Sequence, residues 1–284
     1  MTKAYSSVVK TAQDYYNSDD ADNFYYHVWG GEDIHIGIYE NAGEAIADAS
    51  QRTVATIAAI AAQSHPALDP TTRILDVGAG YGGAARWLAR EFGCRVTCLN
   101  LSETQNARNR IMSAEQGLSE QIEVVDGSFE EIPSPDGTFD LAWSQDAILH
   151  SGHRDRVLTE VDRVLKPGGE FIFTDPMQAD DCPSGVLQPV LERIHLDSLG
   201  SIAFYRQQAT LRGWEELSVQ DLTPQLVTHY TRVRQELESR RQTLGGKVSE
   251  DYMERMIQGL NHWISAGKKG YLSWGILHFR KPSR

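Results

Sequence analysis

Residues 74–83 read ILDVGAGYGG, a short β-prone run that leads into a glycine-rich turn. The segment after the turn, residues 84–91, reads AARWLARE and has the composition of a helix. Glycines between a strand and a helix let the backbone approach a ligand closely, and the first helical turn presents unpaired N–H groups to it. Asp76 precedes Gly78, and its carboxylate would repel a pyrophosphate but suits a ligand with an ammonium or sulfonium group. The stretch therefore predicts a binding turn for a cofactor that carries positive charge.

Two kinds of cofactor remain open for this turn. Gly78, Gly80 and Gly83 also satisfy the G-x-G-x-x-G pattern of dinucleotide-binding proteins, whose usual support is an acid about 20 residues further on. Here the next β-prone run ends at Asn100, which is neutral but could still hydrogen-bond a ribose. With Asp76 before it, the turn resembles the first motif of the class I S-adenosylmethionine (SAM)-dependent methyltransferases. We favour that interpretation over a dinucleotide site or a purely structural turn.

Length, composition and charge argue against several classes of protein. The chain has 284 residues, 40% of them hydrophobic, enough for one large domain or one domain with a sizeable insertion. No run approaches the ~20 apolar residues that span a bilayer. The amino-terminal residues 1–22 are polar and acidic, without the features of a targeting segment, so we expect a cytoplasmic protein. The net charge of −12 argues against nucleic acid as a partner, and monomer and homodimer both stay open.

The cysteines do not predict a metal site. Cys94, Cys98 and Cys182 lack the spacing and the partner histidines of metal ligands, so we expect no metal. Cys94 and Cys98 flank a predicted strand, and we expect both to be buried, reduced thiols.

Strand-like and helical segments alternate through the middle of the chain. The strand-like runs are 73–77, 95–99, 122–125, 139–143 and 170–174, and the helical runs between them are 84–92, 103–115 and 154–165. Such alternation implies right-handed crossovers and a parallel sheet covered by helices on both faces. The sequence KPGG at 166–169 predicts a turn into the fifth strand.

The alternation breaks after Pro176. Residues 184–212 and 224–267 are mostly helical, a strand is expected at 214–222, and the chain ends in an apolar strand at 271–280. The fold class is therefore α/β, a doubly wound, mostly parallel, seven-stranded Rossmann-like sheet whose last strand can lie antiparallel near the edge.

We expect one methyltransferase domain with four parts. Residues 1–64 form an aromatic and helical cap with a helix at 41–63, residues 65–176 the SAM-binding core, residues 177–267 a helical insertion with one strand, and residues 268–284 the terminal strand. Ligands of such sheets bind at the carboxyl edge, beneath the insertion.

Candidate cofactor contacts follow the second and third strands. Asn100 and Leu101 end the second strand, and Gln105 lies one turn into the next helix. Ser128 and Phe129 follow the third strand, where adenine is commonly held in such proteins. Phe129 could offer its backbone N–H, pack against the base, or be a core aromatic residue.

Polar residues also follow the fourth strand. Gln145, Asp146 and His150 are expected to face the crevice at the carboxyl edge of the sheet. A histidine beside an acid could accept a proton from a bound ammonium, whereas Asp146 could equally cap a helix. Methyl transfer to an amine needs positioning and a dry pocket, so no nucleophilic triad is expected.

An aromatic-rich segment at 24–39 reads FYYHVWGGEDIHIGIY. Aromatic rings beside an acid suit a methylated ammonium by cation–π attraction, although each ring could equally fix this segment to the core. In the insertion, Arg193 with His195 and Arg206 with Tyr205 are two candidates to bind a carboxylate, and a surface position is open for each arginine.

The whole set of motifs resembles the sarcosine/dimethylglycine N-methyltransferases. The set comprises NFYYHVWGGEDIHIGIYE, LDVGAGYGG, LNLSETQNARN, WSQDAILHS, RVLKPGG, TDPM and GKKGYLSWGILHFRKP, and it runs from about Asp14 to Pro282. The glycine motif is common to the superfamily, whereas the aromatic segment, the SQDA-x-LHS string and the terminal SWGILHFRK string are much narrower. The resemblance implies SAM as cofactor and methylation of sarcosine and N,N-dimethylglycine to the osmolyte glycine betaine.

The resemblance also implies site residues. On the cofactor side they are Asp76, Gly78, Gly80, Asn100, Leu101, Gln105, Ser128, Phe129 and Gln145. On the side of the substrate, a small amine with a carboxylate, His150, Tyr26 and Gln145 are the expected catalytic residues, and Trp29, Tyr205 and Arg206 the expected binding residues. Arg206 is the candidate for the substrate carboxylate. Asn100 and Ser128 stand where many such enzymes have an acid.

Other functions remain open. A methyltransferase for another small amine, a natural product or a fatty-acyl chain is one alternative, because the aromatic segment also resembles the cyclopropane synthase group. A fatty-acyl substrate would require a wide apolar tunnel and no carboxylate-binding residue. The other alternative is a non-enzymatic SAM- or NAD-binding regulator, which would show no turnover with any amine.

Overall fold

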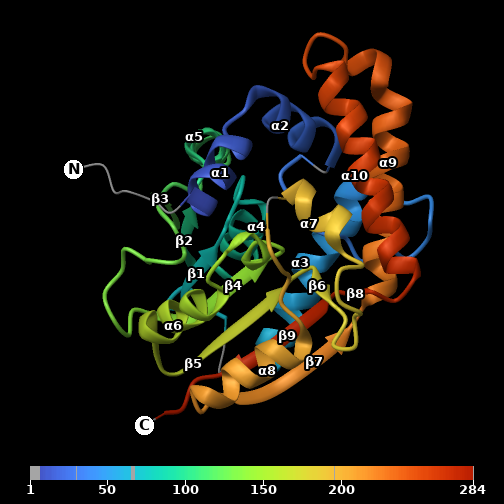
Figure 1. The fold of residues 1–284 in the computed structure, drawn as a ribbon. Helices are drawn as coiled ribbons and strands as arrows, with labels where there is room; N and C mark the ends of the chain where they lie inside the picture. The colour runs from blue at the N-terminus through green and yellow to red at the C-terminus, as the bar shows by residue number, and fades with distance from the viewer. Residues whose placement is uncertain (1–6, 30, 65–67, 195, 284) are drawn as a thin grey trace.

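The computed structural model describes residues 7–29, 31–64, 68–194 and 196–283 (Figure 1). The helices are α1 (Ser7–Tyr16), α2 (Asp19–Phe24), α3 (Ile46–Ser64), α4 (Gly83–Phe92), α5 (Glu103–Glu115), α6 (Arg154–Val164), α7 (Gln188–Ile194), α8 (Ile202–Leu211), α9 (Thr223–Leu244) and α10 (Glu250–Lys268), with short turns η1 (Tyr25–Trp29) and η2 (Ile148–His150). The strands are β1 (Arg73–Val77), β2 (Arg95–Asn100), β3 (Ile122–Asp126), β4 (Phe139–Gln145), β5 (Leu165–Thr174), β6 (Met177–Gln178), β7 (Glu215–Asp221), β8 (Leu272–Ser273) and β9 (Gly275–Arg280).

The main sheet confirms the predicted fold class. It has seven strands in the order β3-β2-β1-β4-β5-β9-β7, and the first five are parallel. The last strand, β9, is antiparallel to both β5 and β7, next to the edge, as its position after the insertion predicts. The strand order reverses between β1 and β4, so the crevice of this doubly wound sheet opens at the carboxyl ends of these two strands.

Helices cover both faces of the sheet, and alternate residues of the strands supply the two cores. On one face Ile74, Trp143 and Ile172 pack with apolar residues of α3 and α4. On the other face Leu75 and Phe173 pack with residues of α6 and α8. The alternation of buried side chains follows from the two-residue period of a strand. Cys94 and Cys98 are buried in the first of these cores, as expected.

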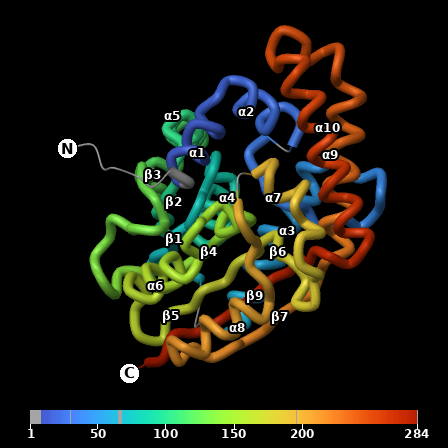
Figure 2. Tube along the Cα trace, viewed as in Figure 1, coloured from blue at the N-terminus to red at the C-terminus, as the bar shows by residue number. Residues whose placement is uncertain are grey.

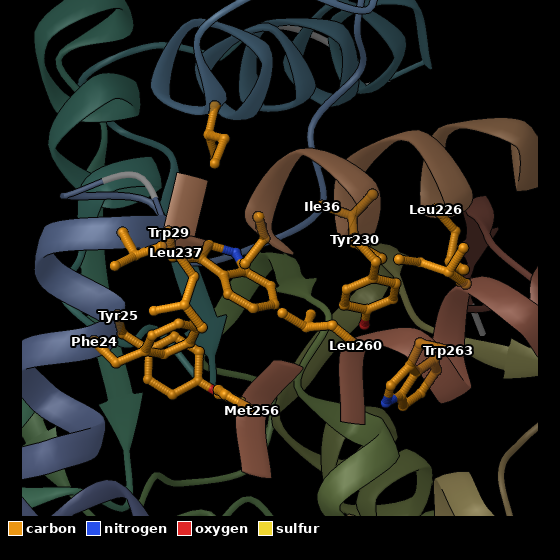
Figure 3. Close-up of a cluster of buried hydrophobic side chains, with 14 of the residues drawn as sticks. Phe24, Tyr25, Trp29, Ile36, Leu226, Tyr230, Leu237, Met256, Leu260 and Trp263 are labelled. Carbon is orange, nitrogen blue, oxygen red and sulfur yellow. The ribbon is translucent and has the colours of Figure 1, made fainter. Parts of the chain in front are cut away.

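A third core joins the amino-terminal segment to the insertion. Figure 1 shows α9 and α10 as a long pair beside the sheet, with α1 and α2 near the carboxyl ends of the strands. In Figure 2 the blue amino-terminal segment runs next to the red and orange helices, and the backbone N–H of Ser249 donates to Asp20 at 2.7 Å. Figure 3 shows Phe24, Tyr25 and Trp29 packed with residues of α9 and α10 such as Leu237 and Met256.

Several element ends differ from the sequence-based expectation. The predicted turn at 166–169 is an excursion within β5, because Leu165 already pairs with Phe139 and pairing resumes only at Glu170. The expected helix at 224–267 is divided into α9 and α10, and the side chain of Ser249 caps the second of them. The expected strand at 271–280 is interrupted at Trp274. The N–H of this residue donates to the hydroxyl of Thr223 at 3.1 Å, so that β8 turns away to pair with β6.

Candidate functional site

A cavity of about 730 Å³ opens at the carboxyl ends of β1, β2, β3 and β4, beside the point between β1 and β4 where the strand order reverses. We call it the first cavity. Among the residues that line it are eight of the nine proposed as cofactor contacts: Gly78, Gly80, Asn100, Leu101, Gln105, Ser128, Phe129 and Gln145. The ninth, Asp76, is absent from the lining. These side chains come from four separate strand ends and meet here because parallel strands end at the same edge of the sheet.

The glycine turn forms the floor of the first cavity. Gly78 has a φ of 81° and Gly80 a φ of 52°, a left-handed backbone that favours glycine. A Cβ at Gly78 would also come within 2.3 Å of the Cβ of Ala147. The backbone therefore approaches the cavity as closely as the sequence motif predicts.

The first cavity contains buried amide groups without a partner. Within the part of the chain that the structure describes, Nε2 of Gln105 and Nε2 of Gln145 have no hydrogen-bond partner. The carbonyl of Gln105 accepts from Nδ2 of Asn100 at 3.0 Å, and that of Gln145 accepts from the indole of Trp143 at 2.9 Å. Both amides are thus held in place by one end. Because unsatisfied buried donors are costly, these two groups fit a ligand with several acceptors.

Asp76 lies buried near the glycine turn rather than in the lining of the cavity. Burial raises the pKa of its carboxyl group to about 7, with a further contribution from Asp33 and against the effect of His35. A carboxylate in this state is stabilised by any cation that comes near it. The site therefore favours a ligand with a positive charge above the glycine turn.

A second cavity, of about 610 Å³, adjoins the first. The two share four lining residues, Tyr16, Ile34, Asp146 and His150, which we call the junction. The rest of the second cavity is lined by aromatic and aliphatic side chains and by Arg193, most of them from the amino-terminal segment and the insertion. Figure 3 shows several of these residues within one cluster, among them Tyr25, Trp29, Tyr230, Leu260 and Trp263. Two chambers joined at one place can hold two ligands end to end.

Asp146 holds the junction together. Its φ of 52° is positive, a conformation uncommon outside glycine. One carboxylate oxygen accepts from the backbone N–H of Ile36 at 2.6 Å, and the other accepts from the indole of Trp274 at 2.7 Å. The carboxylate thus joins the amino-terminal segment to the terminal strand at the place where the cavities meet.

His150 lies at the junction in an environment that keeps it neutral. Its Nε2 is 2.8 Å from the hydroxyl of Tyr16, and the two rings meet edge to face. Burial, and secondly the charge of Arg193, lower the pKa of His150 to about 4. The expected role of His150 as a proton acceptor is therefore not supported, because such an imidazole is a weak base at neutral pH.

Three residues expected on the substrate side lie outside both cavities. Tyr26 faces the guanidinium of Arg108, whose carbon is 4.7 Å from the ring centroid. The hydroxyl of Tyr205 is buried and donates to Asp175 at 2.6 Å. Arg206 lies at the surface in a bidentate ion pair with Glu216, with distances of 2.8 and 2.9 Å. Each of the three has a structural partner that accounts for its position. The surface position of Arg206 and its pairing with Glu216 contradict the prediction that it binds the substrate carboxylate.

Trp29 and Arg193 do line the second cavity. His195, the expected partner of Arg193, lies outside the described residues. Other lining residues, among them Tyr16, Tyr230 and Trp263, had no role in the sequence-based site. For Tyr16 the sequence signal is the repeated tyrosine pair, at 15–16 and 25–26, on an unusually aromatic amino-terminal segment.

The amino-terminal segment closes over the first cavity through hydrogen bonds from several positions. Asn17 accepts from the hydroxyl of Ser102 at 2.8 Å, next to the cavity wall. Asp22 accepts from the hydroxyl of Tyr81 at 2.8 Å and forms an ion pair with Arg108. This segment therefore both covers the ligand space and supplies part of its wall.

Loss of the side-chain amide of Asn100 is expected to weaken binding of the cofactor more than binding of the second ligand. The side chain of Asn100 lines only the first cavity and positions Gln105. In Asn100→Ala, we expect the Michaelis constant for the cofactor to rise about fivefold, which corresponds to the ~1 kcal/mol of one hydrogen bond, with little change for the other substrate. Steady-state kinetics with each substrate varied in turn measures the difference. Equal losses for both substrates would indicate a folding role instead.

Comparison with known proteins gives a family and near relatives. The family model described as "Methyltransferase domain" matches residues 75–173. The chain is 56% identical over 280 residues to a sarcosine/dimethylglycine N-methyltransferase of Halorhodospira halochloris, covering 99% of each chain. It is 58% identical over 282 residues to one of Aphanothece halophytica, covering 99% of this chain and 100% of the other. A solved structure of a candidate sarcosine dimethylglycine methyltransferase from Galdieria sulphuraria matches with 43% identity and a TM-score of 0.90, over 95% of this chain and 100% of that one.

Proposed function

The chain belongs to the sarcosine/dimethylglycine N-methyltransferase family, and from this premise we propose that it methylates sarcosine and then N,N-dimethylglycine with SAM, giving glycine betaine. The observation that carries the proposal is the pair of cavities joined at Tyr16, Ile34, Asp146 and His150. One chamber has the glycine turn of a SAM site, and the other is lined by aromatic rings, which suit a methylated ammonium. The product, glycine betaine, is an osmolyte.

The residues of the first cavity fit SAM. The unpaired amide donors of Gln105 and Gln145 suit a ligand with many acceptor atoms, and the glycine turn leaves room for close approach of its backbone. Asp76 supplies negative charge for the cationic part of the ligand. Bound SAM supplies an electrophilic methyl group on a sulfonium.

The chain itself positions the two substrates and excludes water from the site. The amino-terminal segment covers the cavities, so an amine at the junction can approach a ligand in the first cavity from one direction only. Displacement at a methyl group requires the attacking nitrogen in line with the leaving sulfur, and holding both partners in one orientation provides most of the rate enhancement that such a site can give. Aromatic walls exclude water and stabilise the positive charge of a methylated nitrogen by cation–π attraction.

Two features argue against a fatty-acyl substrate. The second cavity contains the charged side chain of Arg193, and its wall includes rings from the amino-terminal segment, α9 and α10. A long alkyl chain would leave the charge of Arg193 without an anion in an apolar environment, which is costly. The carboxylate of a short zwitterion can pair with it.

A panel of amines tests the proposed function. Purified protein with SAM is incubated separately with glycine, sarcosine, dimethylglycine and phosphoethanolamine, and the products are read by mass. We expect mass gains of methyl groups on sarcosine and dimethylglycine. A protein inert toward both amines would overturn the proposal.

Loss of His150 should not change the shape of the pH profile. An imidazole with a pKa of about 4 is uncharged at neutral pH, and so weak a base does not take up the proton of the substrate ammonium. We therefore expect the rate to rise with pH in both the wild type and His150→Phe, as the free amine becomes more abundant, with a constant ratio between them. The measurement is the dimethylglycine rate from pH 6 to about 10. A ratio that approaches one at alkaline pH would restore His150 as a proton acceptor.

A further inference from the structure

One cation in the second cavity has no acidic partner among the described residues. Arg193 lies in the last turn of α7, lines the second cavity, and directs a guanidinium N–H toward the sulfur of Met256. Its electrostatic neighbours are the tyrosines Tyr15, Tyr25 and Tyr252, and it also donates a hydrogen bond to Tyr15. No carboxylate of the described residues lies within ion-pair distance of it. The other arginines discussed above, Arg108 and Arg206, each have such a partner.

A buried guanidinium without an anion beside it destabilises the folded protein. Charged groups taken out of water are normally paired, because neighbours such as sulfur and aromatic rings replace little of the lost hydration. The hydroxyl of Tyr15 accepts from Arg193 and is also shared with Tyr252 at 2.9 Å and with Tyr25 at 3.4 Å. One neutral hydroxyl and the sulfur of Met256 engage only part of the five N–H donors of a guanidinium, and neither carries a negative charge. Arg193 can therefore still bind a ligand with a carboxylate, whose geometry matches the guanidinium fork.

The position of Arg193 relative to the first cavity determines how a bound zwitterion is oriented. Arg193 lines the second cavity but not the first, whereas His150 and the rest of the junction line both. The charge of Arg193 reaches His150, since it contributes to the low pKa of that imidazole. A zwitterion as short as dimethylglycine, held by its carboxylate at Arg193, therefore extends its nitrogen toward the junction.

We propose that Arg193 binds the carboxylate of sarcosine and dimethylglycine and so selects amino acids over amines that lack a carboxylate. The inference rests on the proposed function and names the residue that gives it substrate specificity. The tyrosines around Arg193 shield the ion pair from water, which strengthens it. The same pair fixes one end of the substrate and leaves the nitrogen at the open junction.

Two substitutions at position 193 test the proposal by substrate affinity. In Arg193→Met, which keeps the length of the side chain, we expect the Michaelis constant for dimethylglycine to rise about 10- to 100-fold, the range for one charged hydrogen-bonded contact. In Arg193→Lys, which keeps the charge but loses the fork, we expect a smaller rise. The matched control is Arg206→Met, at the surface ion pair, which should leave the constant unchanged.

A second readout is independent of turnover. Calorimetry of glycine betaine binding to the protein saturated with S-adenosylhomocysteine should show the same loss of affinity in Arg193→Met. The affinity for SAM, whose cavity Arg193 does not line, should stay unchanged and shows that the variant is folded. The preference for dimethylglycine over N,N-dimethylethanolamine, which lacks the carboxylate, should shrink by a similar factor.

Gly259 offers a variant that moves Arg193 without removing it. A Cβ at Gly259 in α10 would come 2.0 Å from the Cδ and Nε of Arg193, so Gly259→Ala must displace the guanidinium. Alanine also favours the helix, so folding should not suffer from propensity. We expect a rise in the Michaelis constant for dimethylglycine with unchanged SAM affinity, as in Arg193→Met.

The outcomes separate this proposal from the function on which it rests. If the wild type methylates dimethylglycine but Arg193→Met keeps both its affinity and its preference over dimethylethanolamine, the role of Arg193 is overturned and the function stands. If the wild type methylates neither sarcosine nor dimethylglycine, the function itself fails. Loss of SAM affinity in Arg193→Met would also contradict the proposal, because it would indicate a structural role.

Discussion

Asp76→Asn is expected to weaken SAM binding and, at the same time, to stabilise the free protein above neutral pH. Burial raises the pKa of this carboxyl in the folded protein to about 7 from its ordinary value of 3.8. The shift corresponds to roughly 4 kcal/mol at most, and it acts against the folded state. Because the folded pKa is raised, the folded state loses stability as pH rises from about 4 to about 7, and a neutral asparagine avoids this loss. Losing the charged partner should weaken SAM binding by about 1–3 kcal/mol.

Urea denaturation at several pH values measures the stability effect, and calorimetry measures SAM affinity. The advantage of Asp76→Asn should be largest above pH 7, should vanish near pH 4, and should shrink when the protein is saturated with SAM. Asp175 is a matched control, since burial also raises the pKa of its carboxyl to about 7 but its oxygens accept from Tyr205 and Leu149 rather than lying beside the glycine turn. Asp175→Asn should leave SAM affinity unchanged. Unchanged SAM affinity in Asp76→Asn would remove the proposed charge interaction.

Asp146→Ala should destabilise the protein by about 3–5 kcal/mol and abolish most methyl transfer. The substitution leaves the N–H of Ile36 and the indole of Trp274 without their acceptor, at a cost of about 1–3 kcal/mol each. It also places alanine at a φ of 52°, where it is less favourable than aspartate. Because the junction lies between these two contacts, its geometry should be lost before the sheet unfolds.

Hydrogen exchange distinguishes this local effect from general instability. The amide of Ile36 should lose protection in Asp146→Ala more than amides of the central strands do. Asp146→Asn keeps one acceptor and tolerates the backbone conformation, so it should lose about half as much stability. Wild-type stability in Asp146→Ala would contradict the bridging role of the carboxylate.

Local sequence patterns were sufficient to predict the parallel strands of the sheet. The runs at 73–77 and 139–143 match β1 exactly in extent and β4 in its start, because strand formation here follows from continuous apolar stretches bounded by turns. The interruption at Trp274 was not predictable in this way. It depends on a hydrogen bond to Thr223 from the insertion, and no pattern within 271–280 encodes that partner.

The sequence by itself determined the fold class, the family resemblance and the residues around the glycine turn. Eight proposed cofactor residues follow strands of one parallel sheet, so the topology brings them to one edge. Only the tertiary structure decided the substrate side, where Arg193 rather than Arg206 reaches the cavity. Both arginines lie on helices of the insertion, and their local sequences do not distinguish them. What separates them is long-range packing: α7 lies against α10 beside the tyrosines, whereas Arg206 meets Glu216 at the surface.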